Sequence, residues 1–185
     1  MRTTRAVIRE HGGPGVIAFE DATLPHPGRD EVQVRINAIG LNMIDTYHRS
    51  GIYPVALPSG LGIEFAGRIE IIGENVAGFK IGDRVAAFAP PLGAYATARN
   101  VPASILVPIP DDLGDEEAAA VLLKGCTAEF LIERCGRIEA GMDVLIHAAA
   151  GAMGLLLTQW LTAIGARVIG TTSSDEKAEK AKAMG

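Results

Sequence analysis

Hydrophobic and polar residues alternate in short segments along the first part of the chain. In residues 31–40, EVQVRINAIG, every second residue from Val32 to Ala38 is apolar and the residues between them are polar. A period of two predicts a strand with one face in the core and the other in water. Similar segments, separated by Gly, Pro and Asn, stand at 5–10, 64–74 and 84–90. This part of the chain is therefore predicted to be rich in β-strands.

A helical pattern interrupts these strands at residues 42–54, NMIDTYHRSGIYP. We expect one or two helical turns that end at Gly51, because glycine readily takes the left-handed conformation that ends helices. A loop with Pro54 and Pro58 follows. Loops of this kind often carry functional residues.

From Asp111 onward the pattern becomes helical. Acidic residues precede a run rich in Ala and Leu, and they favour a helix N-terminus through the helix dipole. Gly125 is predicted to divide this stretch into two helical pieces, since glycine costs about 1 kcal/mol relative to alanine inside a helix. A domain boundary between residues 120 and 140 follows.

The last part of the chain alternates between strand and helix patterns. The segments 142–148, 154–165 and 166–171 predict a strand, a helix and a second strand, in that order. A final helix is predicted to open with a capping box, in which Glu176 follows Ser173 at the required spacing. This order is typical of a β-α-β-α unit with parallel strands.

The turn of this unit, HAAAGAMG, contains no side chain larger than methionine after its histidine. On the G-x-G-x-x-G pattern of dinucleotide sites, its three key positions are Ala149, Gly151 and Gly154, so one glycine is replaced. Alone the pattern is weak, and the alternative is that the glycines only allow a tight turn and close helix packing. Its position between strand and helix favours a pyrophosphate site at the helix N-terminus.

Residues after the second strand of this unit bear on which dinucleotide would bind. NAD enzymes place an Asp or Glu there for the ribose 2′-hydroxyl, whereas this chain has GTTSS and no acid before Asp175. The hydroxyls of Ser173 and Ser174 and the charge of Lys177 suit a 2′-phosphate, which predicts NADP. The alternative for Lys177 is an ordinary solvated helix residue.

Composition limits the classes of function. The chain has 185 residues, 48% of them hydrophobic and 21% charged, as in ordinary folded proteins. Its net charge of −5 gives no reason to expect nucleic acid or an anionic membrane as a partner. Without an apolar span or a signal-like N-terminus, we expect a soluble cytoplasmic protein.

Cys126 and Cys135 lack the spacing of a redox or zinc site and are predicted to be buried thiols.

Several motifs in one order carry a family resemblance. They are HGGP at 11–14, the segment 42–54, LPSGLGIEFAG at 57–67, GDRVAAF at 82–88, LGAYA at 92–96 and HAAAGAMG at 147–154. Together they resemble the NADPH-dependent quinone oxidoreductases, the zeta-crystallin-like, zinc-free branch of the medium-chain dehydrogenase/reductases. The resemblance implies a GroES-like, partly open β-barrel catalytic domain at 1–124, a Rossmann NADP-binding domain from 125 to 185, and an active site between them. Only the first β-α-β-α of that second domain is expected, which predicts a truncated chain.

The same resemblance implies that no metal is bound. In the zinc branch a histidine stands where this chain has Ile63, and the catalytic cysteine is missing from LNMID. No group of four cysteines is present for a structural zinc, and the four histidines lack ligand spacing.

The resemblance also implies the site residues. The catalytic candidates are Asn42, Tyr47 and Tyr53, and the residues expected to contact NADPH are Asn42, Ile44, Asp45, Thr46, Tyr47, Thr127, Gly151, Ala152, Met153, Ser173, Ser174 and Lys177. The reaction implied is hydride transfer to a quinone or another conjugated carbonyl, with the two tyrosines or water as candidate proton donors. As alternatives, Asn42 and Asp45 would only cap the short helix and the tyrosines would only pack.

Two hypotheses from different classes follow. In the first, the chain is the catalytic half of an NADPH:quinone oxidoreductase, expected to be a homodimer. In the second, it is a noncatalytic, truncated GroES-like module that self-associates through exposed apolar surface. The helical residues expected either to form that surface or to be covered by a second copy are Leu155, Leu156, Leu157, Trp160 and Leu161.

Overall fold

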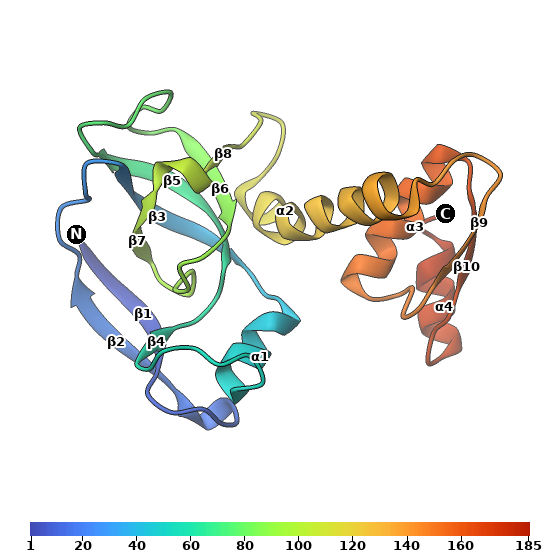
Figure 1. Ribbon diagram of the computed structural model, residues 1–185, viewed down its shortest axis with the longest axis horizontal. Helices are drawn as coiled ribbons and strands as arrows, with labels where there is room; N and C mark the ends of the chain where they lie inside the picture. Colours follow the sequence, from blue (N-terminus) through green and yellow to red (C-terminus); the bar gives the residue numbers. More distant parts are fainter. The chain divides into compact units, whose positions relative to one another are not determined.

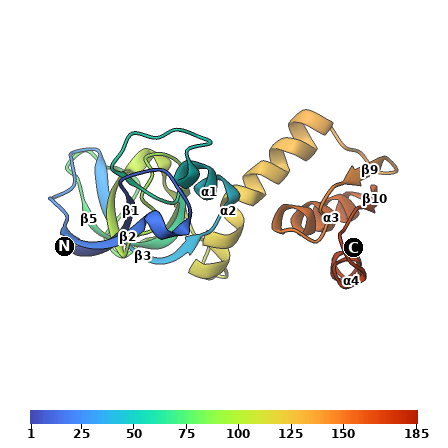
Figure 2. The same ribbon diagram turned by 90° about the horizontal axis from the view of Figure 1, so that it is seen from below.

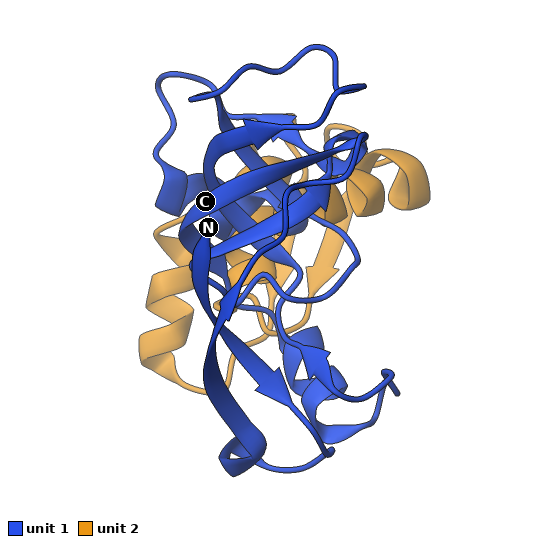
Figure 3. Ribbon diagram, turned by 90° about the vertical axis from the view of Figure 1, so that its left-hand side faces the viewer, with its two compact units in different colours: residues 1–123 blue, residues 124–185 orange.

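The computed structural model describes all residues from 1 to 185 and divides them into two compact units, Met1–Leu123 and Lys124–Gly185 (Figure 3). The strands of the first unit are β1 (Arg2–Ile8), β2 (Ile17–Thr23), β3 (Glu31–Gly40), β4 (Ser59–Gly60), β5 (Glu64–Ile72), β6 (Arg84–Phe88), β7 (Ala98–Pro102) and β8 (Val107–Pro108) (Figure 1). Short 3-10 helices stand at Pro14–Val16 and Ala103–Ile105. No helix has both the length and the apolar character needed to span a membrane.

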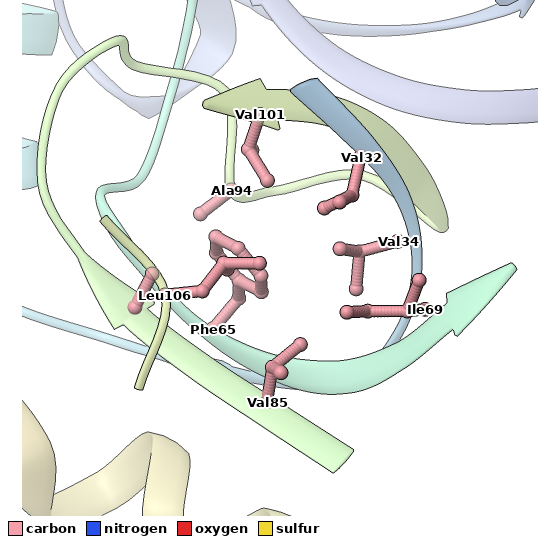
Figure 4. Packing of buried hydrophobic residues seen from close by; sticks show 9 residues of the cluster. Val32, Val34, Phe65, Ile69, Val85, Ala94, Val101 and Leu106 are labelled. Atoms are coloured by element: carbon pink, nitrogen blue, oxygen red, sulfur yellow. The ribbon is translucent and has the colours of Figure 1, made fainter. Parts of the chain in front are cut away.

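The first unit contains two antiparallel sheets, ordered β2-β1-β4 and β7-β3-β5-β6-β8. Its core lies on the inner face of the larger sheet, where Phe65 stands among apolar side chains from neighbouring strands (Figure 4). The buried members of this cluster are Val32, Val34, Phe65, Ile69, Val85, Ala87, Ala94, Val101 and Leu106. The predicted β-rich first part is confirmed.

Strand β3 departs from the predicted alternation at Gln33, whose side chain is fully buried. The Gln33 amide donates to the Pro25 carbonyl at 3.2 Å and to the Asn100 side chain at 2.9 Å. Hydrogen bonds of this kind offset the cost of burying a polar group. The prediction that this whole face is in water is therefore wrong at Gln33, because the segment around Pro25 covers it.

Helix α1 (Met43–Ser50) ends as predicted at Gly51, which takes the left-handed conformation with φ of 84°. The second helix, α2 (Asp115–Glu129), passes through Gly125 without a break and continues as a π-helix at Phe130–Gly136. The prediction that Gly125 divides this stretch is wrong. The loss in helix propensity at one glycine is small beside the packing of the helix.

Both cysteines are exposed, which corrects the prediction of buried thiols. Cys126 lies in α2 and Cys135 in the π-helix, whereas the buried side of these elements carries Ala128 and Ile132. The apolar character of a thiol does not fix which side of a helix it occupies, because packing of the neighbouring residues decides that.

The Gly125→Ala substitution is expected to stabilise the chain by about 0.5–1 kcal/mol, because a Cβ there meets nothing within 4 Å. Urea unfolding followed by far-ultraviolet circular dichroism measures this free energy. A loss of stability would show that α2 needs flexibility at this glycine.

The second unit holds a parallel pair of strands, β9 (Asp143–Ile146) and β10 (Arg167–Gly170), joined through α3 (Ala152–Ile164). Helix α4 (Asp175–Lys182) follows, and α3 runs beside the two strands (Figure 2). Side chains from all four elements, with Ile132 of the π-helix, form one apolar cluster. The predicted β-α-β-α order is confirmed.

Two predictions for this unit are wrong in detail. The N-cap of α4 is Ser174, whose hydroxyl accepts from the Lys177 backbone N–H at 3.4 Å, so the expected capping box at Ser173 does not form. Of the five α3 residues expected at an apolar surface, Leu161 is buried within the chain because α3 packs on the strands, whereas Leu155, Leu156, Leu157 and Trp160 are half-buried. The exposed large apolar side chains of the strands are instead Leu145 and Ile169, which are 57% and 48% exposed.

Candidate functional site

The N-terminus of α1 is held by a buried carboxylate. Asp45 is 4% exposed, and its Oδ2 accepts from the Asn42 backbone N–H at 2.9 Å and from the Tyr95 hydroxyl at 2.7 Å. Burial and the neighbouring carboxylate raise the pKa of Tyr95 well above its ordinary value, so this hydroxyl stays protonated and donates. Asp45 therefore ties the start of α1 to the segment around Tyr95.

Asn42 is bound through its side chain to a second buried carboxylate. Its Nδ2 donates to Glu64 Oε2 at 2.8 Å, and Glu64 Oε1 accepts from the Leu123 backbone N–H at 2.7 Å. Glu64 has no exposed surface. Gly40 makes room for it, because a Cβ at Gly40 would lie 2.2 Å from Glu64 Oε2 and 2.3 Å from the Ala119 carbonyl.

The remaining candidates of this segment lie along α1 and just beyond it. Ile44, Thr46 and Tyr47 are half-buried, and the Thr46 hydroxyl donates back to the Met43 carbonyl at 2.7 Å. The Tyr53 ring meets the Tyr47 ring edge-on, with centroids 5.4 Å apart. Tyr53 is 49% exposed, so this pair offers an accessible aromatic surface.

The turn of the second unit depends on Gly154. A Cβ there would lie 2.5 Å from the Ala148 carbonyl oxygen and 2.6 Å from Ala149, so the helix approaches the turn as closely as glycine allows. Gly151 is the N-cap of α3, and the N–H groups of Ala152 and Met153 open its first turn. Such N–H groups have no partner within the helix and suit an anion.

A pocket of 390 Å³ connects this turn with the residues after β10. Its lining includes Gly151 from the turn and Ser173 and Lys177 from the start of α4. The Lys177 ammonium donates to the Ser173 hydroxyl at 2.9 Å. Two of the three groups predicted to hold an adenosine phosphate thus lie in the same pocket as the turn, whereas the hydroxyl of Ser174 caps α4.

The predicted residues fall into two groups. The first unit brings together those between Asn42 and Tyr53, and the second unit holds those at the turn and the start of α4, together with Thr127 on α2. Sequence reasoning missed Glu64 and Tyr95 as parts of the site. The signal for Glu64 was a charged residue directly before the apolar Phe65 and Ala66 of a central strand.

No group of three or more His, Cys, Asp or Glu side chains is arranged to hold a metal ion in residues 1–185. At position 63, where the zinc branch would have a histidine, the side chain is isoleucine and is 7% exposed.

Two antiparallel sheets followed by a β-α-β-α unit with a glycine turn fit the expected order of a GroES-like domain and the first part of a Rossmann domain. Residues 28–111 match the alcohol dehydrogenase GroES-like domain. The chain is 49% identical to the quinone oxidoreductase of Pseudomonas aeruginosa over 182 residues. These residues make up 98% of this chain and 56% of that protein. It is 43% identical to a 2-haloacrylate reductase from a Burkholderia species, over 97% of this chain and 56% of that protein.

The crystal structure of the Escherichia coli quinone oxidoreductase complexed with NADPH superimposes with a TM-score of 0.96 at 43% identity, over 98% of this chain and 56% of that one. The predicted resemblance to the quinone oxidoreductases, which extends over nearly the whole of this chain, and the predicted fold class are therefore confirmed. It spans about half the length of the curated relatives it matches.

Proposed function

We propose that this chain supplies the GroES-like catalytic domain, 1–124, and the first part of the NADP-binding domain, 125–185, of a zinc-independent NADPH:quinone oxidoreductase. The observation that carries this proposal is the pocket shared by Gly151, Ser173 and Lys177. It joins helix N–H groups suited to a pyrophosphate with a cation and a hydroxyl suited to a 2′-phosphate. The relative crystallised with NADPH supports the same cofactor.

When bound, NADPH supplies a hydride that reduces a quinone or a conjugated carbonyl, and the family of relatives supports a quinone. The protein has to orient two flat rings and exclude water. Asn42, Ile44, Thr46 and Tyr47 are proposed to contact the nicotinamide half, with Thr127 beside its ribose. Asp45, whose Oδ2 is already bound by Asn42 and Tyr95, is proposed to act mainly by positioning α1.

The accessible ring pair of Tyr47 and Tyr53 is proposed to border the substrate. A flat aromatic substrate stacks well on such a surface. The half-exposed Tyr53 hydroxyl, or water, would donate the proton that completes reduction of the carbonyl oxygen. Zinc independence is supported by Ile63, because an isoleucine side chain has no atom that can bind a metal.

The cofactor proposal is tested by the Lys177→Met substitution. The affinity for NADPH is expected to fall by about 10- to 100-fold, since a hydrogen bond to a charged group contributes about 1.5–3 kcal/mol. The affinity for NADH, which lacks the 2′-phosphate, should be unchanged. Titrations that follow cofactor fluorescence measure both dissociation constants.

The matched control is Lys180→Met, which removes the same charge from an exposed position of α4 outside the pocket. It should leave both affinities nearly unchanged. Equal losses in the two variants would show that net charge, not a phosphate contact at Lys177, favours NADPH.

A second candidate function is self-association without catalysis. The exposed Leu145 and Ile169 on the parallel strands favour it, because contiguous apolar surface promotes association. Light scattering on the purified chain separates the two candidates. A dimer that binds neither nucleotide would support the second, and nucleotide binding by a folded chain would support the first.

A further inference from the structure

A pocket of 530 Å³ opens in the first unit, away from the residues assigned to the cofactor. Strands β1, β4 and β7 and the segment 91–93 line it. Its walls include the side chain of Arg99, which projects from β7. Nothing in the proposed hydride transfer uses this pocket.

Arg99 is a buried cation with few partners. Arg99 is 7% exposed, and its Nη2 donates to the Pro91 carbonyl at 2.7 Å. The guanidinium carbon lies 5.6 Å from the centroid of the Phe65 ring. Nη1 is buried and has no hydrogen-bond partner. Burial lowers the pKa of Arg99 to about 10, which still leaves it protonated at neutral pH.

The other charged side chains of this pocket have hydrogen-bond partners, and among them only Glu31 has no partner of opposite charge. Glu20 accepts from Arg5 at 2.7 Å and from Arg9 at 2.8 Å. Glu31 accepts from the Gly28 backbone N–H at 2.9 Å. None of the ion pairs in the chain includes Arg99. Arg99 is thus the one cation of the pocket wall that no carboxylate balances.

We propose that this pocket is an anion site in which Arg99 holds a small oxyanion, the carboxylate or phosphate group of a small molecule. Buried charges in proteins are normally paired, and a lone buried guanidinium is costly. The planar fork of arginine matches the oxygens of carboxylate and phosphate, and such bonds are the strong ones. The pocket volume is large enough for a small acid.

Access to the unpaired Nη1 requires the segment at Pro91 to shift, because Nη1 is shielded from water. Because this segment has to move, anion binding should change the environment of Leu92 and Gly93, which line the pocket beside Pro91. It should also change the Arg99 side-chain N–H signal.

The first test is a titration of the isotope-labelled chain followed by nuclear magnetic resonance. Potassium phosphate and potassium acetate are added in separate arms, with potassium chloride at equal ionic strength as the reference. We expect saturating shifts of the Leu92, Gly93 and Arg99 signals with at least one oxyanion and not with chloride. Saturation by phosphate alone or by acetate alone identifies which group the site takes.

Variants then assign the effect to the guanidinium. Arg99→Lys keeps the charge without the fork and is expected to weaken binding at least about tenfold, the loss of one charge-assisted hydrogen bond. Arg35→Met is the control, since Arg35 is an exposed residue of β3 outside the pocket, and should bind as the unaltered chain does. Shifts that never saturate, or that are equal in Arg99→Lys, would overturn the proposal and leave the pocket to water. The titration of the unaltered chain decides the question even if a variant fails to fold.

Discussion

The Gly154→Val substitution is expected to abolish measurable NADPH binding and to destabilise the second unit by about 3 kcal/mol or more. The added side chain would begin with a Cβ placed 2.5–2.6 Å from backbone atoms of Ala148 and Ala149, which cannot move aside as a flexible side chain could. Either α3 shifts away from the turn or the turn opens. Both changes move the N–H groups proposed to hold the pyrophosphate.

Tryptophan fluorescence measures the loss of stability in the second unit. Trp160 is the single tryptophan and lies in α3, so its emission during urea unfolding reports that unit. NADPH affinity is measured on the same samples by the change in cofactor fluorescence. The expected result is an earlier unfolding midpoint together with the loss of binding.

Gly151→Ala is the graded control. Its Cβ would lie 3.1 Å from the Ala148 carbonyl oxygen, a contact that a small adjustment relieves, and its φ of −75° suits alanine. We expect weaker NADPH binding with nearly unchanged unfolding. Full NADPH affinity in Gly154→Val would contradict the proposed position of the pyrophosphate, whatever happens to stability.

The Glu64→Leu substitution is expected to reduce the free energy of unfolding of the first unit by about 3–5 kcal/mol. It removes the acceptor of the Asn42 side-chain amide and of the Leu123 backbone N–H, which now bind it at 2.8 Å and 2.7 Å. A buried donor that loses its acceptor costs about 1–3 kcal/mol. Glu64→Gln keeps the volume and one acceptor oxygen, so a smaller loss of about 1–3 kcal/mol is expected.

Tyrosine signals report the unfolding of the first unit, because all three tyrosines, Tyr47, Tyr53 and Tyr95, lie in it. Tyrosine side-chain signals in nuclear magnetic resonance spectra, followed during urea unfolding, give the free energy without a contribution from Trp160 of the second unit, and hydrogen exchange at Leu123 follows the broken bond directly. Glu70→Gln is the control, since Glu70 forms an exposed pair with Arg35 and such pairs contribute about 0–1 kcal/mol. Equal losses in the free energy of unfolding for Glu64→Leu and Glu70→Gln would show that the buried carboxylate of Glu64 does not stabilise its contacts with Asn42 and Leu123.

The candidate site was partly accessible from the sequence. The turn at Gly151 and the phosphate candidates Ser173 and Lys177 follow from local spacing within a β-α-β pattern, and the structure places these three in one pocket. The contacts that hold Asn42 were not accessible, because Glu64 stands 22 positions further along the chain. The role of each site residue stays a prediction until the substitutions are measured.

The sequence by itself determined the type and order of the main elements. A period of two in residues 31–40, the helical pattern before Gly51 and the β-α-β-α order of the second unit all depend on neighbours along the chain. Local sterics and the burial of one face are enough to select such elements, so the residue pattern carries them.

Only the tertiary structure decided which polar groups are buried and what they bind. Gln33 leaves water because a distant segment covers it, and α2 continues through Gly125. Tyr95 reaches Asp45 across 50 positions, and Arg99 becomes a buried cation on a pocket wall. Burial of a polar group depends on chain segments that meet only after folding, and no local pattern records which segments those are.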